Sequence, residues 1–589
     1  MRIIDRIPVK AVIATTSSAS SFPAASSHEN RSLCFTDRSN RLRAEVEAAP
    51  WVSDCVPRLK AAAASGVLQL VVGDYTEPGA SAKDGPCANA ALIEVNLAEG
   101  FVSAISSIVG LPPISLRKDP RFNSLSCPLF PGADNASSVD IDGVADTLRW
   151  GHPLDGRTIY KDLGIVPPRS SVVLEADKPA TVERLRTTDA PQSYGTLSPA
   201  QLLEAQVAAM LASAKRMPTS GAVLSLSGGL DSRTASVALL SQGNRVPCVS
   251  MATSPYSLDA HIARQFCIEN ELPHEIIEFR DDYIKRLPDL ARQSAALTGG
   301  VACLGQTVDL YLYSCLNNAS HIRISGHLGN QVGRGGVESI AAASLNDQIF
   351  SEELRRALER RPREPWFLPR MAQAGYASVL FEQEVHYWSI ANFMLGSSRA
   401  LQLSPYADVA LIELSKAAIS RDPRFSNPTR ASIRRRDLRH RLFGPPVALS
   451  FQRTILTRYG TAGRDVPINW GWRARGGWSV RGSPAALRFA ADALACKIGR
   501  QYKVLKNPMA RLSRALGNPS ELVAWQDVIQ GPLRELTCDT LLSRSTAESG
   551  LFHLTSLRRV LDEHFQARTD HHATIVRALE IALGLASRW

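Results

Sequence analysis

The hydrophobic positions of this chain follow two different patterns, and the change between them lies near residue 190. Between residues 41 and 190, short apolar runs occur at residues 67–74, 91–95 and 170–175, and turn residues bound them. Short apolar runs bounded in this way are typical of buried strands. We therefore predict a β-rich α+β domain over residues 41–190.

After residue 190 the pattern alternates between helix and strand. Residues 191–220 carry apolar side chains on one face of a helix. Alternating strands and helices follow, and we expect the strands at residues 222–226, 246–251 and 271–279. This alternation predicts a parallel sheet with helices on both faces. We expect this α/β domain, with a helical C-terminal part, to occupy residues 191–589.

The N-terminal segment and the cysteines indicate a cytoplasmic protein. The apolar run over residues 11–14 is too short for a secretory signal, and Ser and Ala dominate after it, so we predict a disordered leader over residues 1–40. The sequence contains no run of about 18 uncharged apolar residues, so we expect no membrane-spanning helix. None of the ten cysteines form a Cys-x-x-Cys pair, which favours reduced thiols over a zinc site.

The net charge of +11 raises the question of a nucleic acid partner. Basic residues cluster at residues 355–363 and 434–441, but no nucleic-acid recognition motif accompanies them. We expect solvated helix faces, or a surface for an acidic peptide, and neither a nucleic acid nor a membrane partner.

The chemistry is concentrated where the first strand of the α/β domain meets its helix, in the motif Ser-Gly-Gly-Leu-Asp-Ser at residues 227–232. Gly228 and Gly229 allow a tight turn that brings backbone N–H groups against an anion. Hydroxyl groups from three serines and the helix N-terminus add to this site. Asp231 repels a bare phosphate unless a cation such as Mg²⁺ lies between them. The alternative is a glycine turn in which Asp231 only caps the helix.

A second stretch of the same kind covers residues 322–336. An apolar strand runs into Ser325 and Gly326, and more small residues follow. At the carboxyl edge of a parallel sheet, this loop is expected beside the nucleotide.

The form Ser-Gly-Gly-Leu-Asp-Ser resembles the pyrophosphate loop of the asparagine synthetase family, whose members split ATP between the α and β phosphates. The resemblance implies an adenine nucleotide α-hydrolase-like fold that uses ATP and Mg²⁺. It implies Asp231 and Asn330 as metal ligands. The expected nucleotide-binding residues are Ser225, Ser227, Gly228, Gly229, Leu230, Asp231, Ser232, Met251, Ser325 and Gly326.

The second stretch departs from the family pattern. His327 stands where the family has Glu, and Asn330 stands where it has Asp. His327 is therefore a candidate base, with a loop histidine in a decayed site as the alternative. Glu384 is a candidate support for the base. The lysine that stabilises departing pyrophosphate in the family is missing, and Arg458 is expected to replace it; Arg464, Lys503 and Lys506 are further candidates.

Residues 154–168 resemble a segment of the N-terminal glutaminase domain of the same family. That domain uses a cysteine directly after the initiator Met, whereas this chain begins Met1-Arg2 and its first cysteine is Cys34. An internal thiol lacks the free amine that serves as base. We therefore expect a glutaminase-like domain without glutaminase activity.

The resemblance implies a ligase that adenylates a carboxylate and joins it to an amine. Family members with an inactive N-terminal domain include the lasso-peptide cyclases, and we expect a macrolactam-forming ligase of that kind. Its expected partners are a peptide or amino-acid carboxylate substrate, a precursor peptide and the leader protease of that peptide. The alternatives are an asparagine synthetase, glutamine-hydrolysing or ammonia-dependent, and a non-catalytic scaffold on this fold.

Overall fold

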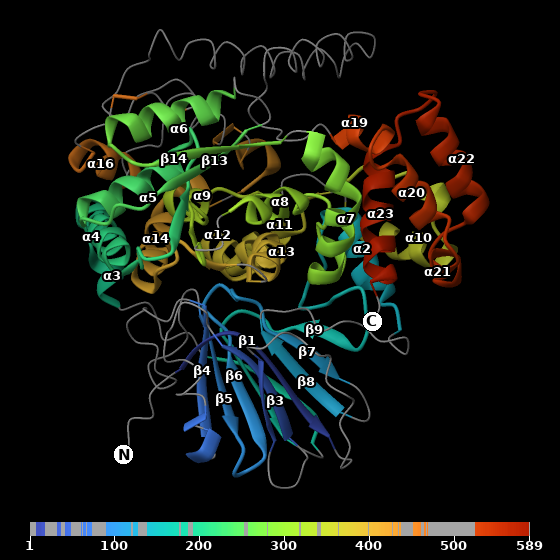
Figure 1. Ribbon diagram of the computed structural model, residues 1–589, viewed down its shortest axis with the longest axis horizontal. Helices are drawn as coiled ribbons and strands as arrows, with labels where there is room; N and C mark the ends of the chain where they lie inside the picture. The colour runs from blue at the N-terminus through green and yellow to red at the C-terminus, as the bar shows by residue number, and fades with distance from the viewer. Residues whose placement is uncertain are drawn as a thin grey trace.

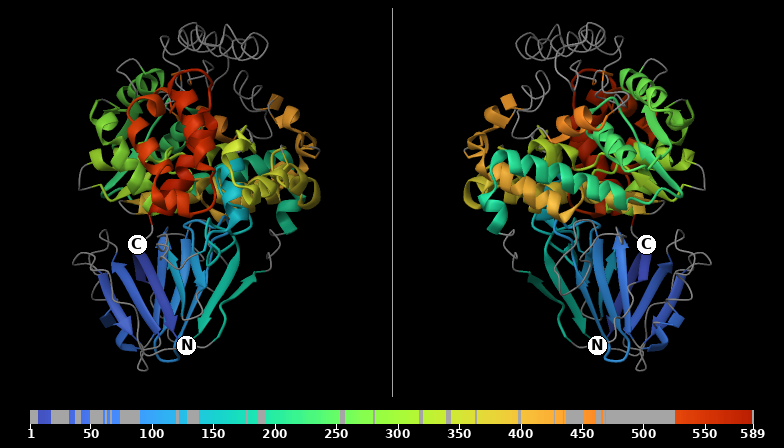
Figure 2. Two further views of the ribbon diagram at one scale, coloured as in Figure 1. Left: turned by 90° about the vertical axis from the view of Figure 1, so that its right-hand side faces the viewer. Right: turned by 90° about the vertical axis from the view of Figure 1, so that its left-hand side faces the viewer.

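The computed structural model contains two halves that pack on one another (Figures 1 and 2). It describes residues 7–17, 32–36, 42–48, 60–61, 63–65, 67–73, 90–118, 122–127, 138–175, 178–185, 192–252, 257–279, 281–316, 320–338, 343–362, 364–397, 400–426, 428–433, 435–436, 451–460, 465–466, 468 and 525–587.

In the lower half of Figure 1, eleven strands of the described residues form one sheet. The main path runs in the order β11-β10-β6-β5-β4-β1-β8-β7-β9, and β3 joins β1 to β2. The strands are β1 (Ile7–Ser17), β2 (Ser32–Thr36), β3 (Leu42–Ala48), β4 (Val67–Gly73), β5 (Ala90–Asn96), β6 (Phe101–Ile105), β7 (Ser115–Lys118), β8 (Phe122–Cys127), β9 (Leu163–Ile165), β10 (Ser170–Glu175) and β11 (Thr181–Arg184).

The predicted disordered leader differs from this structure. β1 lies inside the sheet, antiparallel to β3 and β8 and parallel to β4. β2 pairs with β3. Residues 7–17 and 32–36 are ordered because their backbone N–H and C=O groups join these ladders, and no property of these residues in isolation reveals their distant partners.

The upper half contains a five-stranded sheet in which every pairing is parallel. Its strands are β12 (Ala222–Ser225), β13 (Cys248–Ala252), β14 (His274–Glu278), β15 (Ile322–Ile324) and β16 (Leu401–Leu403), in the order β14-β13-β12-β15-β16. The chain adds strands outward from β12 in one direction and then returns to its other side. The order therefore reverses between β12 and β15, which is where open parallel sheets bind their ligands.

Helices cover this sheet and extend beyond it (Figure 1). The first group is α2 (Ile141–Trp150), α3 (Gln192–Thr196), α4 (Pro199–Arg216), α5 (Leu230–Ser241), α6 (Leu258–Glu269), α7 (Asp281–Thr298), α8 (Thr307–Cys315), α9 (Gly329–Arg334) and α10 (Glu352–Glu359). The second group is α11 (Phe367–Ala374), α12 (Tyr376–Val379), α13 (Val385–Ser397), α14 (Val409–Arg421), α16 (Phe451–Arg458), α19 (Trp525–Gln530), α20 (Arg534–Leu541), α21 (Arg544–Glu548), α22 (Leu554–Phe565) and α23 (His572–Ala586). Short turns η1 (Asp347–Ile349) and η3 (Pro423–Phe425) are 3₁₀-helical, and η2 (Leu380–Glu384) is π-helical.

Local signals explain where α4 and α14 begin. Ser198 and Gln201 form a reciprocal capping box at the start of α4, and Pro199 occupies its first turn. Asp408 caps α14 by accepting the N–H of Leu411 at 2.8 Å. Both helices therefore start at residues whose side chains satisfy the first N–H groups.

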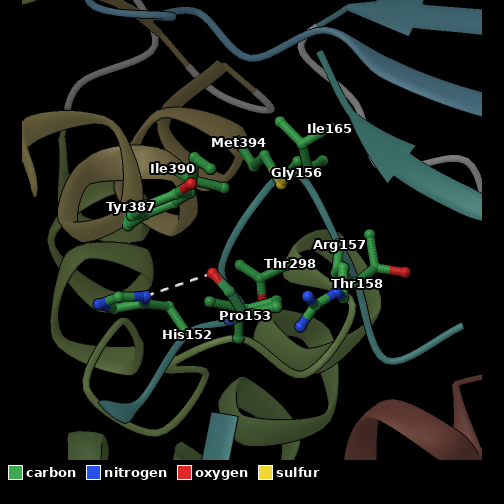
Figure 3. Close-up of a pocket in the computed structure, with 11 residues that line it drawn as sticks. His152, Pro153, Gly156, Arg157, Thr158, Ile165, Thr298, Tyr387, Ile390 and Met394 are labelled. Carbon is green, nitrogen blue, oxygen red and sulfur yellow. Dashed lines mark hydrogen bonds between the residues drawn. The ribbon is translucent and has the colours of Figure 1, made fainter. Parts of the chain in front are cut away.

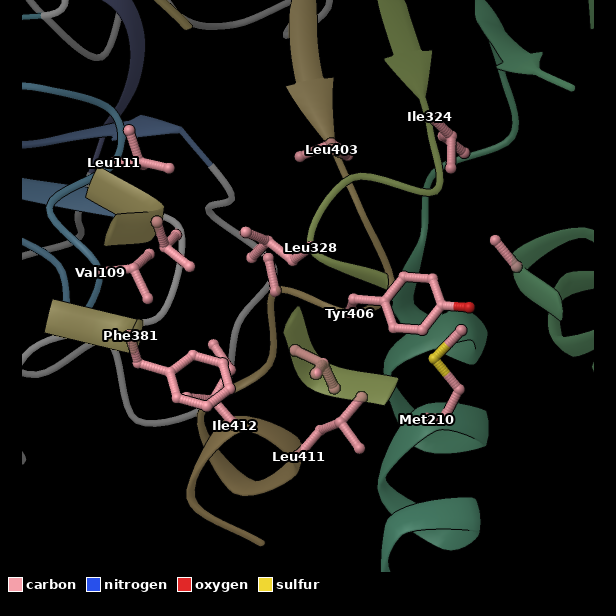
Figure 4. Packing of buried hydrophobic residues seen from close by; sticks show 14 of the residues in the cluster. Val109, Leu111, Met210, Ile324, Leu328, Phe381, Leu403, Tyr406, Leu411 and Ile412 are labelled. Carbon is pink, nitrogen blue, oxygen red and sulfur yellow. The ribbon is translucent and has the colours of Figure 1, made fainter. Parts of the chain in front are cut away.

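The two halves share hydrophobic cores. One cluster combines Val109 and Leu111 of the β-rich half with Met210, Leu328 and other residues near the parallel sheet (Figure 4). A second cluster joins Val144, Ile159 and Tyr160 to the C-terminal helices. Residues 139–163, expected in the first domain, therefore pack in part with residues near the end of the chain. None of the described helices is long and apolar enough to cross a membrane.

Candidate functional site

Both predicted loops meet at the reversal of strand order. β12 ends at Ser225 and β15 ends at Ile324, and each strand is followed by one of the loops. The loops touch, because a Cβ atom at Gly326 would lie only 2.6 Å from the backbone nitrogen of Ser232. Gly326 is thus required by close approach between the second loop and the start of α5.

The first loop is stabilised by its own hydroxyl groups. The N–H of Ser227 donates to Oγ of Ser232 at 3.0 Å, and the two hydroxyl oxygens lie 3.0 Å apart. The N–H of Gly229 donates to Oγ of Ser227 at 3.2 Å. Ser227 and Ser232 therefore hold the turn in shape, in addition to any contact they make with a ligand.

The start of α5 keeps the properties of an anion site. Gly229 occupies the N-cap position and offers no side-chain acceptor, so the first turn, which includes Leu230, lacks a side-chain cap. Asp231 is not the cap that the alternative reading required. Gly228 lies against α6, because a Cβ atom there would lie 2.7 Å from Oδ1 of Asp259. Backbone N–H groups at a glycine turn before a helix of 12 residues can bind a phosphate.

Asp231 is engaged by two side chains from other elements. Its Oδ2 accepts from Nη2 of Arg334 at 2.7 Å, and its Oδ1 accepts from Nε2 of Gln452 at 2.7 Å. Gln452 is fully buried on α16 and also donates to the hydroxyl of Tyr406 at 3.0 Å. The Tyr406 hydroxyl donates to the backbone carbonyl of Asp231 at 3.0 Å. Burial, and then the charge of Asp231, raise the pKa of Tyr406, so its hydroxyl stays protonated.

The second predicted metal ligand is engaged by the same arginine. Oδ1 of Asn330 accepts from Nε of Arg334 at 3.2 Å, and Nδ2 of Asn330 donates to Glu338 at 2.6 Å. Both carboxylate oxygens of Asp231 and the amide oxygen of Asn330 were expected to face Mg²⁺. Each of them accepts a hydrogen bond from an N–H donor instead. Within the part of the chain that the structure describes, no group of three or more His, Cys, Asp or Glu residues could hold a metal ion. In this structure Asp231 and Asn330 both bind Arg334, and their predicted role as Mg²⁺ ligands stays a prediction.

Ser225 and Met251 lie at the ends of neighbouring strands. Oγ of Ser225 accepts from Nε of Arg323 at 2.8 Å, and Arg323 is buried in an ion pair with Asp309 at 2.6 Å. The Ser225 hydroxyl therefore has a structural partner. Met251 is half-buried near the carboxyl end of β13, beside β12. Its predicted contact with the nucleotide stays a prediction.

His327 has a neutral ring at neutral pH. Its Nε2 lies 2.9 Å from Oγ of Ser389, and its ring meets Phe393 edge-on at 5.4 Å between centroids. Burial, and to a lesser degree the charge of Arg323, lower the pKa of His327 to about 4. A base with this pKa accepts a proton weakly at pH 7. The catalytic role predicted for His327 stays a prediction, and this environment favours hydrogen bonding over proton transfer.

Glu384 and Arg458 take up different positions from the expected site. Glu384 is fully buried at the end of η2, where one carboxylate oxygen accepts the N–H of Glu338 at 2.7 Å. It therefore does not lie on a solvated helix face. The guanidinium of Arg458 forms an exposed two-point pair with Glu204 of α4, at 2.7 and 2.8 Å. The structure does not bring Arg458 to the loop.

Three other candidate cations, Arg464, Lys503 and Lys506, lie outside the described residues. Arg334 and Gln452 are the contacts of Asp231 that sequence reasoning missed. Arg334 follows Asn330 by one helical turn, and this spacing was the available signal. Gln452 carried no comparable signal, because α16 is distant from the loop in the sequence.

A small cavity lies between the two halves (Figure 3). His152, Thr158, Ile165, Tyr387 and Met394 are among its lining residues. Its volume of about 20 Å³ has room for a water molecule and not for a nucleotide. The cavity is therefore too small to be the nucleotide site, and its lining includes no residue of the phosphate loop.

Comparison with known proteins adds a likeness to solved structures. No family model and no curated protein sequence matches this chain. Among solved structures, the chain is similar to the NMN synthetase of Francisella tularensis, with 18% identity and a TM-score of 0.17 over 37% of this chain and 93% of that chain. A likeness at this level carries no argument about this protein, so its chemistry is inferred from the site.

Proposed function

We propose that this protein is an ATP-dependent ligase that activates a carboxylate and joins it to an amine. The observation that carries the proposal is the place of residues 227–232, at the reversal of a parallel sheet and at a helix start without a side-chain cap. The carboxyl edge of such a sheet is where nucleotides bind, and N–H groups at a helix start bind phosphate.

The reaction takes two steps. A carboxylate oxygen of the substrate attacks the α-phosphorus of ATP, and the bond to the β-phosphate oxygen breaks to release pyrophosphate. An amine then attacks the acyl carbon, AMP leaves, and the amine loses a proton. The N–H groups of the loop and of the first turn of α5 would stabilise the negative charge that develops on departing pyrophosphate.

The more specific proposal is macrolactam formation within one peptide, which joins its α-amine to an Asp or Glu side chain. The resemblance to cyclases with an inactive N-terminal domain supports it, and so does the net charge of +11, which suits an acidic peptide.

Pyrophosphate release tests the proposal. The full chain is incubated with ATP and one of three acceptor sets: a peptide with a free α-amine and an acidic side chain, aspartate with ammonium, or no acceptor. Release with the peptide and a product lighter by one water support macrolactam formation. Release only with aspartate and ammonium would replace it with asparagine synthesis. No release and no ATP binding would leave a non-catalytic scaffold.

A matched pair of serine variants ties turnover to the loop. Ser232→Ala removes the hydroxyl that holds Ser227, and we expect the rate of pyrophosphate release to fall about fivefold, because one hydrogen bond contributes about 1 kcal/mol. Ser314→Ala, on the exposed side of α8, is the control. Equal rates for both variants would argue against the loop as the reaction site.

A further inference from the structure

Arg334 connects the two residues that the sequence predicted as metal ligands. Its Nη2 donates to Asp231 at 2.7 Å and its Nε donates to Asn330 at 3.2 Å. Asp231 belongs to the first loop and Asn330 to the second, so one guanidinium links both sides of the strand reversal. The Arg334 guanidinium thus supplies a positive charge beside Asp231, where the sequence analysis predicted a cation.

Glycines allow this close assembly. A Cβ atom at Gly329 would lie 2.5 Å from Cβ of Asp231, and one at Gly336 would lie 2.1 Å from Oδ1 of Asn330. The backbone at the first residue of α9 therefore packs against Asp231, and the backbone just after α9 packs against Asn330. This packing fixes Asp231 and Asn330, and hydrogen bonds to both of them then hold the Arg334 guanidinium.

The guanidinium retains donors for a ligand. A guanidinium has five N–H groups, and the contacts to Asp231 and Asn330 use two of them. Nη1 of Arg334 has no hydrogen-bond partner among the described residues. The Arg334 side chain keeps 20% of its surface exposed, so solvent reaches it. Guanidinium groups bind phosphate oxygens in a two-point geometry that an ammonium cannot reproduce.

We propose that Arg334 is the phosphate-binding cation of this site, with Asp231 and Asn330 as the residues that position it. This inference rests on the proposed function and names the residue that would meet the pyrophosphate group of ATP. Asp231 then acts by holding an arginine, and the protein needs no metal ion of its own to bind pyrophosphate.

Binding of inorganic pyrophosphate to the full chain, measured by calorimetry with EDTA and again with Mg²⁺, tests the inference. We expect binding in EDTA. Arg334→Ala should weaken it about tenfold to a hundredfold, because a hydrogen bond to a charged group contributes about 1.5–3 kcal/mol. The pyrophosphate affinity of Arg334→Lys should lie between those of the parent and Arg334→Ala, since lysine keeps the charge and loses the planar guanidinium.

The control is Arg292→Ala, which removes the same charge from an exposed pair with Asp289 on α7 and should bind like the parent. Thermal melting of each variant checks that it is folded. Binding that requires Mg²⁺, or that survives in folded Arg334→Ala, would overturn the inference and leave the ligase proposal standing. Absence of pyrophosphate and ATP binding under both conditions would overturn both.

Discussion

At the scale of single residues, glycines set how closely the two loops approach. Gly326 meets the backbone at Ser232, and Gly329 meets the side chain of Asp231. In both cases the absent Cβ leaves room for another part of the site. Neither glycine is required by a left-handed backbone, so their identity follows from contact between elements.

Gly326→Ala should disturb the site more than an average glycine substitution. The added methyl group would lie 2.6 Å from the Ser232 nitrogen, and backbone cannot yield as a flexible side chain can. We expect a loss of about 1–3 kcal/mol in stability, together with weaker ATP binding. Urea denaturation and a binding titration measure the two effects. Gly305→Ala, whose Cβ would have its nearest neighbour at 3.6 Å, is the control, and an equal loss there would contradict the argument.

At the scale of elements, buried ion pairs join the β-rich half to the helices of the other half. Arg169, just before β10, forms an ion pair with Glu413 of α14 and lies 3.9 Å from Glu382 of η2. Lys416 lies 3.4 Å from Glu382 and 3.5 Å from Glu413. The backbone at Arg169 has a left-handed φ of 54°, a conformation that glycine adopts more readily.

Arg169→Ala should therefore destabilise the molecule by about 3 kcal/mol, because it leaves buried carboxylates short of a positive charge. Arg169→Gly loses the same ion pair but relieves about 1 kcal/mol of backbone strain, so it should melt above Arg169→Ala. Thermal unfolding ranks the two variants and the parent. Lys178→Ala, in an exposed pair with Glu175, is the control. A parent-like melting temperature for Arg169→Ala would show that the pair contributes nothing.

Asp408 combines two roles at the start of α14. Its Oδ1 caps the helix, and its Oδ2 pairs with Arg216 of α4 at 2.7 Å. Asp408→Asn keeps a capping oxygen and loses the charge, whereas Asp408→Ala loses both. We expect the alanine variant to be less stable than the asparagine variant by about 1 kcal/mol, as measured by chemical denaturation. Equal stability would show that the cap is dispensable.

At the scale of the whole molecule, three buried histidines make stability depend on pH. Burial lowers the pKa of His152, His327 and His386 to about 4. His386 shows the cause, since its Nδ1 donates to the Gly110 carbonyl at 3.1 Å while its buried Nε2 has no partner among the described residues. A proton added at Nε2 would place a charge in the contact between the two halves.

Stability should therefore fall on acidification. Above pH 6.5 these histidines are neutral in the folded and unfolded chain alike, and their effect on stability is constant. Between pH 6.5 and about 4 the unfolded chain binds protons that the folded chain excludes. Each histidine therefore lowers the free energy of unfolding by about 1.4 kcal/mol for each pH unit of acidification. His386→Asn keeps an N–H donor for Gly110 and removes the titration.

Melting temperatures across this pH range measure the effect. The slope should be shallower for His386→Asn than for the parent, and His261→Asn on the exposed face of α6 is the matched control. An unchanged slope for His386→Asn would show that this histidine takes up no proton on unfolding.

Much of the α/β half could be predicted because its signals are local. The spacing of apolar residues predicts the strand before Ser227 and the helix over residues 191–220, where the structure has α4. The β-rich half was predicted less completely. β1 has no feature of its own that distinguishes it from a leader, since its order comes from partners far along the chain.

By itself the sequence determined that a glycine turn with Asp231 joins a strand to a helix, because turn and helix formation depend on neighbouring residues. Only the tertiary structure decided what faces Asp231, because α9 and α16 come from more than 90 and 200 residues away and no local signal encodes their approach. It likewise paired Arg458 with Glu204 and buried Glu384. The charge that a phosphate would meet is thus set by packing between elements, which cannot be inferred from the amino-acid sequence alone.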